Sequence, residues 1–305
     1  MVSTNIFAGK KGLNLHKVIN GTLSGAHMHD REMKQKPTKK QWEEQCACAT
    51  IKMRDYVKYF ITPVAMIISY EEGKHYGSGT YIEFDKNKFL ITNEHVARKR
   101  RSVALTHQFH SCENILLLTN DFILVPHPRD VAITKIDESI WTSCKHSSRS
   151  IKKQCFAAGH EPVEGELLFF QGYSGQKSMM LFGSLAAKST PHLSRESFFE
   201  SDLSRTEQEA LLKVGFDPEF HFLLSYSSEY AKSVDKKSAY LPTPPGFSGS
   251  LVWNTRLLEV TNADKAWTPE DAKVTGIVWG WDDNYPYLVA TKIEHLSLDE
   301  LITFG

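Results

Sequence analysis

Short apolar runs bounded by turn residues recur through most of the chain, and they restrict its fold more than any other feature. Runs rich in β-branched and aromatic residues, separated by Gly, Pro, Asn and Asp, are typical of short antiparallel strands. The runs cover residues 64–69, 77–84, 89–93, 115–118, 122–125, 130–136, 166–172, 178–184, 220–226, 249–253, 274–281 and 286–293. Because strands do not alternate with helices, we expect a mainly β fold of two six-stranded antiparallel β-barrels side by side.

Helical signals lie at the two ends of this β region and once within its second half. Thr38 with Gln41 is a capping box that predicts a helix over about 39–60, and apolar spacing predicts a closing helix over 295–304. Ser204 with Glu207 predicts one more short helix, inside an insertion. The expected units are an N-terminal leader and helix (1–60), an N-terminal barrel (61–145) and a C-terminal barrel (146–305) that carries the insertion at 191–218.

The charge balance and the distribution of apolar residues exclude several classes of protein. The 36 basic and 36 acidic residues give a net charge of +0, which provides no electrostatic basis for binding nucleic acid or an anionic membrane. No apolar run reaches the ~18–20 residues of a membrane helix, and residues 1–15 lack the apolar core of a secretory signal. The five scattered cysteines do not suggest a disulfide framework, so we expect a cytoplasmic protein.

The stretch Pro245-Gly246-Phe247-Ser248-Gly249-Ser250 carries the clearest chemical signal. A serine hydroxyl becomes a nucleophile only with a base to take its proton, a group that orients the base, and N–H donors for the oxyanion. Glycines on both sides of Ser248 permit a tight turn with backbone N–H groups directed inward. A similar stretch, Gly172-Tyr173-Ser174-Gly175, lies between two predicted strands, and we interpret it as a hairpin turn.

Two earlier residues could supply the missing base and orienting group. His95 follows the strand at 89–93, and such rigid support can present an imidazole as a general base. Asp130 opens the strand at 130–136, where a buried carboxylate needs a partner such as a histidine N–H. Each residue alone has an ordinary explanation, as a core histidine or a turn aspartate.

One further group of residues has metal-binding side chains. His107, His110 and Cys112 are close in sequence, and such residue types ligate zinc. No second ligand cluster accompanies them in the sequence, so we expect no metal site.

The order His95, Asp130, Ser248 decides between two known arrangements of such a triad. An α/β-hydrolase places the serine first and the histidine last, with a glycine two residues after the serine, where this chain has Ser250. The order found here fits a base and its orienting acid on one barrel and the nucleophile on the other.

The chain resembles the trypsin/chymotrypsin-like serine proteases, and in particular the bacterial Deg-type peptidases, over roughly residues 64–302. Residues 77–80 (Gly-Ser-Gly-Thr) and 91–96 (Ile-Thr-Asn-Glu-His-Val) resemble the family's glycine strand and catalytic-histidine segment. Residues 130–133 and 246–250 resemble its aspartate strand and nucleophile turn, and residues 276–280 resemble the strand beside the substrate backbone.

The resemblance implies a chymotrypsin-like fold and a serine endopeptidase that needs neither a metal nor an organic cofactor. It implies that Ser248 attacks the peptide carbonyl, that His95 moves the proton, and that Asp130 orients His95. It also implies an oxyanion hole and contacts with a protein or peptide substrate. In this resemblance, the backbone N–H groups of Gly246 and Ser248 would form the oxyanion hole. The strand residues Val278, Trp279 and Gly280 would contact the substrate.

Two residues depart from the family pattern. Phe247 is larger than the usual residue before the serine and would narrow the site, and Glu94 adds a charge that strand alternation directs away from the site. Phe247 motivates the alternative of a catalytically silent protease-fold binding module, and an esterase on the same triad is a third hypothesis. The sequence leaves open the substrate, the cleavage preference, the oligomeric state and the pathway. It also leaves open whether the leader, the insertion or a regulatory partner gates the activity.

Overall fold

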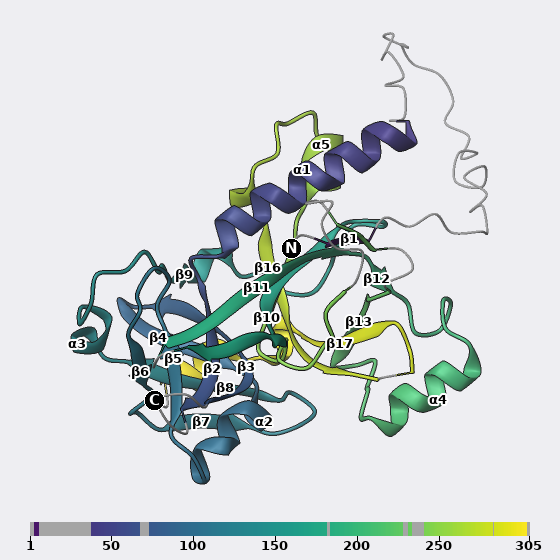
Figure 1. Cartoon of the computed structure of the whole chain (residues 1–305). Coiled ribbons are helices and arrows are strands. Elements are labelled where there is room, and N and C mark those ends of the chain that lie inside the picture. Colours follow the sequence, from purple (N-terminus) through teal and green to yellow (C-terminus); the bar gives the residue numbers. More distant parts are fainter. Residues whose placement is uncertain are drawn as a thin grey trace, which may run out of the picture.

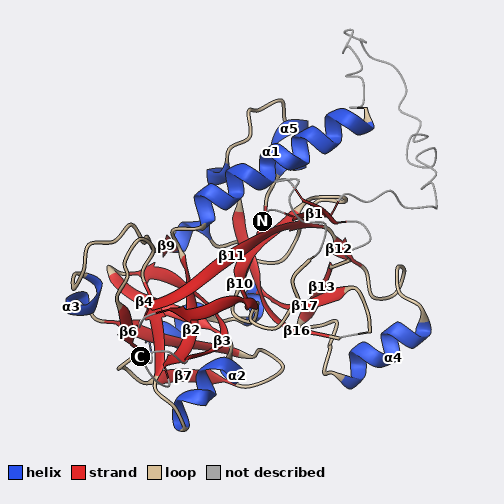
Figure 2. Cartoon of the chain, in the orientation of Figure 1, coloured by secondary structure: helices blue, strands red, loops and turns tan. Residues whose placement is uncertain are grey.

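Two antiparallel sheets form the body of the protein, and a long helix lies across one of them (Figure 1). The computed structural model describes residues 3–5, 38–67, 73–181, 184–227, 231–233, 241–282 and 284–303. Most of the regular elements are strands (Figure 2), so the mainly β, two-barrel architecture expected of a chymotrypsin-like fold is confirmed.

The first sheet has the strand order β6-β5-β2-β3-β4-β8-β7, and β9 pairs with β3 in parallel. A two-residue turn joins β3 to β4, and its residues Asp85 and Lys86 have φ of 47° and 68°. Positive φ at both positions matches the right-handed twist of the strands, so this turn sets the register of the strand that leads to His95. The strands are β2 (Ile61–Ile67), β3 (Gly73–Phe84), β4 (Asn87–Thr92), β5 (Leu105–Gln108), β6 (Ile115–Leu117), β7 (Phe122–Val125), β8 (Val131–Ile136) and β9 (Ile151–Lys152).

The second sheet has the strand order β12-β13-β17-β16-β15-β10-β11-β1-β14. Its interior is an apolar cluster that includes Phe170, Phe222 and Val252, each almost completely buried. The strands are β1 (Ser3–Asn5), β10 (Leu168–Leu181), β11 (Ser184–Ser194), β12 (Glu196–Ser197), β13 (His221–Ser225), β14 (Ala231–Ser233), β15 (Leu251–Asn254), β16 (Lys273–Trp281) and β17 (Tyr287–Lys292). The two sheets thus have eight and nine described strands rather than six each, because short edge strands add to the core set.

The helices cover the outside of the sheets. In α1 (Lys39–Val57), the buried residues Ala49 and Met53 belong to the same core cluster as Trp253 and Trp267 of the second half. The other helices are α2 (Glu94–Ala97), α3 (Glu138–Trp141), α4 (Arg205–Lys213), α5 (Leu257–Asn262) and α6 (Leu298–Thr303). No helix in the described part of the chain has both the length and the apolar character needed to span a bilayer.

The capping signals located the helices well. Thr38 and Gln41 form the predicted capping box of α1, and Ser204 and Glu207 form that of α4. Gly215, with φ of 95°, follows the end of α4 as a C-terminal stop. The closing helix is shorter than expected, because a 3-10 turn occupies residues 293–295 before α6.

Several expectations about strands and turns were wrong. Residues 172–175 are not a hairpin turn but an internal part of the long strand β10, which pairs with β11 as far as Tyr173 and then has an irregularity between Tyr173 and Ser178. Strand β5 and helix α5 were not predicted. Residues Ser3–Asn5 of the leader form β1, between β11 and β14, and the rest of the leader lies outside the described residues. The division at residue 145 stays a prediction, although β9, beyond it, pairs within the first sheet.

Candidate active site

His95 and Asp130, which are far apart in sequence, are directly hydrogen-bonded. His95 lies in helix α2, immediately after β4, and its ring Nδ1 is 2.6 Å from Oδ2 of Asp130. The backbone N–H of His95 also donates to Oδ1 of the same carboxylate, at 3.0 Å. An ionised carboxylate only accepts, so the proton of a neutral His95 ring lies on Nδ1 and its Nε2 is free to accept another. The pairing predicted from the sequence order is therefore present, with Asp130 buried and His95 partly exposed.

The loop that carries Asp130 is held by residues from both sheets. Asp130 has a φ of 46°, a left-handed conformation that costs energy and therefore persists only where the surrounding structure holds it. Asn93, from the first half, donates to the Asp130 carbonyl oxygen at 2.7 Å. From the second sheet, Thr291 donates to the carbonyl oxygen of Arg129 at 2.9 Å. These contacts fix the backbone on both sides of the carboxylate.

His221 on β13 makes the third contact with this loop, and its protonation state follows from its partners. The backbone N–H of Asp217 donates to Nδ1 of His221 at 2.9 Å, so the ring proton lies on Nε2, which donates to the carbonyl oxygen of Pro128 at 2.6 Å. Burial lowers the pKa of His221 to about 4, which keeps the ring neutral. His221 is thus a positioning residue for the Asp130 loop, a role that the sequence did not predict for His221, Asn93 or Thr291. Of the three, only Asn93 lies in a motif that carries the resemblance, at residues 91–96.

Ser248 lies in a tight turn between residue 245 and β15. Gly246 and Gly249 have φ of 101° and 91°, values that side chains disfavour. A Cβ on Gly249 would lie 1.9 Å from the carbonyl oxygen of Ser78, so the glycine is also required by close packing. The two glycines flanking the Phe247-Ser248 pair therefore permit the turn that the sequence predicted.

Two backbone N–H groups in this turn have no acceptor among the residues that the structure describes. The neighbouring N–H groups of Phe247 and Gly249 donate to the carbonyl oxygens of Pro244 and Val278, at 3.0 and 2.9 Å. In the described part of the chain, the N–H groups of Gly246 and Ser248 have no such acceptor, although both residues are buried. Buried amide donors without a partner are costly, and they are the form that an oxyanion hole takes before substrate binds.

The first sheet meets the serine turn at Gly77 and Ser78 of β3. The backbone N–H of Ser78 donates to the carbonyl oxygen of Ser248 at 2.7 Å, and the Ser78 hydroxyl donates to the carbonyl oxygen of Gly246 at 2.8 Å. A Cβ on Gly77 would lie 2.8 Å from Val96, the neighbour of His95, and 2.9 Å from the Ser248 carbonyl oxygen. Gly77 thus separates the histidine segment from the serine turn by only the thickness of one backbone.

The Ser248 hydroxyl itself donates to the carbonyl oxygen of Trp279 over a long distance of 3.4 Å. Among the described residues, no hydrogen bond joins it to His95. The structure therefore places the serine turn next to the His95 segment, with the hydroxyl turned toward β16.

The three residues expected to contact substrate lie on β16, next to Ser248. Val278 is tied to the serine turn, since its N–H donates to Ser250 and its carbonyl oxygen accepts from Gly249, both at 2.9 Å. The pairing of β15 with β16 ends at Ile277, whereas β17 continues to pair with β16 as far as Trp281. Trp279 lies at a bulge in that pairing, and Gly280 follows it. In the described residues, the β15 side of β16 therefore has no strand partner at Trp279 and Gly280.

Phe247 and Glu94 lie in surroundings that differ from those predicted from the sequence. Phe247 is 1% exposed and packs into the second barrel, edge-on to Phe170, with 5.5 Å between the two ring centroids. It therefore does not narrow the site. Glu94 lies in the first turn of α2 rather than on a strand, and it is paired with Arg98 at 3.4 Å.

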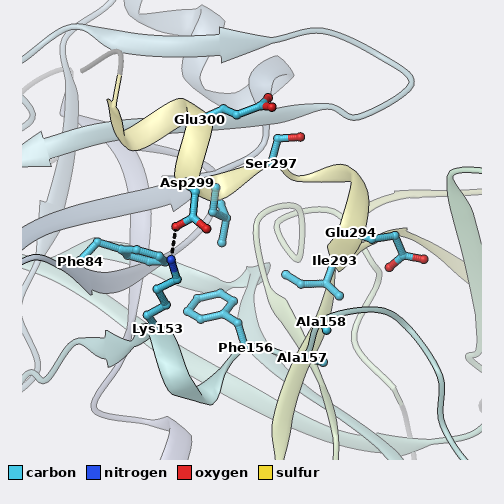
Figure 3. A pocket seen from close by; sticks show the side chains of 11 residues that line it. Phe84, Lys153, Phe156, Ala157, Ala158, Ile293, Glu294, Ser297, Asp299 and Glu300 are labelled. Atoms are coloured by element: carbon cyan, nitrogen blue, oxygen red, sulfur yellow. Dashed lines mark hydrogen bonds and ion pairs between the residues drawn. The ribbon is translucent and has the colours of Figure 1, made fainter.

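A cavity of about 460 Å³ lies elsewhere on the molecule, near the end of β3 and the C-terminal helix α6 (Figure 3). Its lining includes Phe84, Phe156 and Ile293, and an ion pair of 2.6 Å joins Lys153 to Asp299 beside it. None of the candidate catalytic residues lines this cavity, so it is not the site predicted from the sequence.

Comparisons with known proteins add little to these observations. No family model and no curated protein matches the sequence. The tobacco etch virus protease complexed with product is 12% identical with a TM-score of 0.44, over 92% of this chain and 89% of that one. The tobacco vein mottling virus protease is 12% identical with a TM-score of 0.42, over 78% and 79%. An inactive form of Rv3671c from Mycobacterium tuberculosis is 14% identical with a TM-score of 0.44, over 84% and 93%. Such remote likenesses leave the reaction and the substrate of this chain open.

Proposed function

We propose that the protein is a serine endopeptidase that hydrolyses peptide bonds through His95, Asp130 and Ser248. Ser248 attacks the carbonyl carbon and forms an acyl-enzyme, while His95 takes its proton and passes it to the leaving amine. Asp130 keeps the His95 proton on Nδ1 and stabilises the imidazolium that forms. The observation that supports this most directly is the hydrogen bond of 2.6 Å between His95 Nδ1 and Asp130 Oδ2, beside a serine turn.

The unused N–H groups of Gly246 and Ser248 support an acyl-transfer reaction in particular. A tetrahedral intermediate places negative charge on the former carbonyl oxygen, and two preorganised donors lower its free energy. The Ser248 hydroxyl donates to the carbonyl oxygen of Trp279 in this structure, and we propose that bound substrate turns it toward His95 Nε2 instead. Catalytic hydrogen bonds are often long before substrate binds.

The edge of β16 at Trp279 and Gly280, which β15 does not pair with, supports a peptide as the substrate. An extended peptide can add as a strand to a free sheet edge, with main-chain hydrogen bonds that do not depend on its sequence. We propose that Val278, Trp279 and Gly280 provide this edge, which leads the scissile bond to Ser248.

A silent binding module, the main alternative, loses its motivation because Phe247 points into the core. An esterase on the same triad remains a competing proposal, and relative turnover of peptides and esters separates the two. The proposed similarity to Deg-type peptidases and the proposed cytoplasmic location rest on the sequence alone.

The test is cleavage of an unfolded protein such as casein by the wild type, Asp130→Asn and Asp121→Asn. Asp121 is a fully exposed aspartate in the same sheet region, so Asp121→Asn is a matched control for the loss of one charge. We expect Asp130→Asn to lower kcat about 10⁴-fold, because an amide favours the wrong ring tautomer of His95, while Asp121→Asn retains normal activity.

Two results would count against the proposal. One is no turnover of casein or of activated esters by the folded wild type, together with no labelling by a fluorophosphonate probe, which would favour a binding module. The other is equal activity of the two asparagine variants, which would remove Asp130 from the mechanism.

A further inference from the structure

Two thiols of the first barrel face each other, although they are far apart in sequence. Cys112 follows the turn after β5, and Cys144 follows helix α3. Their sulfur atoms are 2.6 Å apart, and neither is bonded to another cysteine. Cys112 is buried and Cys144 is partly exposed, so a reagent from solvent reaches Cys144 first.

The backbone around the two cysteines holds them together independently of the sulfur contact. The N–H of Ser147 donates to the carbonyl oxygen of His110 at 2.9 Å, and the Ser148 hydroxyl accepts from the N–H of His110 at 2.7 Å. The hydroxyls of Ser111 and Ser147 are a further 2.9 Å apart. Three hydrogen bonds therefore fix the segment before Cys112 against the segment after Cys144, so little ordering entropy opposes a bond between them.

We propose that Cys112 and Cys144 are a redox-modification site, at which a small-molecule disulfide converts the two thiols into a reversible intramolecular cross-link. The Cys144 thiolate attacks a disulfide such as oxidised glutathione, and it releases one glutathione thiolate, which takes up the proton lost by Cys144. The Cys112 thiolate then attacks the Cys144 sulfur and releases the second glutathione, which takes up the proton lost by Cys112. The protein sulfurs lose two electrons and the glutathione disulfide gains them.

The cross-link would act on the barrel that carries the candidate base and its orienting acid. The chain between the two cysteines contains β6, β7, the Asp130 loop and β8. Cys112 also belongs to the same apolar cluster as Val96, the neighbour of His95. Closing this loop restricts the unfolded chain, so the oxidised protein is expected to be more stable than the reduced one.

A metal site is the other chemistry that cysteines and histidines here could support. Cys144 and His146 now lie beside the group His107, His110 and Cys112, for which the sequence showed no second cluster. Within the described residues, however, no three such side chains are arranged to hold a metal ion. We therefore assign the pair to thiol chemistry. Burial and the Cys112 thiol raise the pKa of Cys144 to about 11, so the reaction is slow at neutral pH and accelerates as the pH rises.

The experiment is treatment of the purified full chain with oxidised glutathione, followed by alkylation and peptide mass spectrometry without reductant. We expect one cross-linked peptide pair, Cys112 to Cys144, and a rise in Tm of about 5–10 °C that dithiothreitol reverses. Cys144→Ser should abolish both effects. Cys48→Ser, which removes an exposed thiol on α1, should change neither.

Two outcomes would overturn the proposal. One is a glutathione adduct that persists on Cys144 while Cys112 stays open to alkylation after unfolding. The other is one equivalent of bound zinc that protects both thiols from the disulfide, which would assign them to a metal site. Neither outcome depends on the serine reaction, because both are measured without substrate.

Discussion

The stretches 172–175 and 246–249 are almost the same tetrapeptide, Gly-Tyr-Ser-Gly and Gly-Phe-Ser-Gly, in two different conformations. The first is part of strand β10, in which Gly172 and Tyr173 pair with β11, and its fully buried Ser174 donates through the hydroxyl to the carbonyl oxygen of Thr243. The second is a turn with two glycines at positive φ, unused N–H groups and a hydroxyl beside β16. Nearly the same residues are therefore structural in the first stretch and, in our proposal, catalytic in the second.

The difference between the two stretches arises from their neighbours. Pro244 and Pro245 precede the second stretch, and a proline lacks the N–H that a central strand must donate. Phe170 and Gln171 precede the first stretch and continue the ladder with β11. A Gly-x-Ser-Gly pattern is thus informative only together with the residues that decide whether its backbone can remain extended.

The largest expected difference between the two stretches is in catalysis. Ser248→Ala should lower kcat by about 10⁴–10⁶-fold, because it removes the hydroxyl that forms the acyl-enzyme in our proposal. Ser174→Ala should keep most of the activity, and should cost only about 1–2 kcal/mol of stability from a lost buried hydrogen bond. Fluorophosphonate labelling and casein turnover measure both. If Ser174→Ala abolished labelling in a folded protein, the assignment of the two serines would be reversed.

A smaller but still large difference is expected in the tolerance of the last glycine of each stretch. Gly249→Ala combines a φ of 91° with a Cβ 1.9 Å from the Ser78 carbonyl oxygen, so we expect a loss of about 3–5 kcal/mol of unfolding free energy. Gly175→Ala places its Cβ 3.6 Å from the nearest atom, the Pro245 carbonyl oxygen, and should change stability by less than about 1 kcal/mol. Urea denaturation of the two variants tests this, and equal losses would contradict the conformational difference.

The smallest expected effect concerns the contact between the two stretches. The buried Ser78 hydroxyl accepts from the N–H of Tyr173 in the first stretch and donates to the carbonyl oxygen of Gly246 in the second, at 2.9 and 2.8 Å. Ser78→Ala leaves both groups buried without this partner, at a cost of about 1–3 kcal/mol.

A neighbouring residue on β3 provides the control for Ser78. The Thr80 hydroxyl is also buried, but has no hydrogen-bond partner among the described residues. Thr80→Val should therefore be neutral or stabilising in the same urea titration. A Ser78→Ala variant as stable as Thr80→Val would show that the link between the stretches is unimportant.

Much of the fold could be predicted because its signals are local. The capping boxes at Thr38 and Ser204 satisfy helix N–H groups within three residues of themselves, so they act in any surroundings. The turn at Asp85 and Lys86 is also local, because it depends only on the backbone conformation of these two residues. Strand β5 was missed because it pairs with β2, which is distant in the chain. The course of residues 172–175 was missed because β10 continues through this stretch to Leu181 before β11 begins at Ser184.

The candidate site divides in the same way. His95, Asp130 and Ser248 could be chosen because side-chain chemistry and chain order are visible in the sequence. His221 and Thr291 could not, because their role is to hold the carbonyl oxygens of Pro128 and Arg129 across the interface between the sheets. A hydrogen bond to a main-chain carbonyl places no demand on the identity of the accepting residue, so it leaves no pattern in the sequence.

For this protein, the sequence alone determined the mainly β class, the capped helices and the order of the three candidate residues. Only the tertiary structure decided that residues 172–175 continue a strand, which N–H groups of the serine turn have no acceptor among the described residues, and that Cys112 faces Cys144. The physical reason is the separation along the chain of the groups that interact. Turn and cap preferences are set by a few bonds along the backbone, whereas these other features arise where two sheets pack and distant segments compete for the same hydrogen-bond partners.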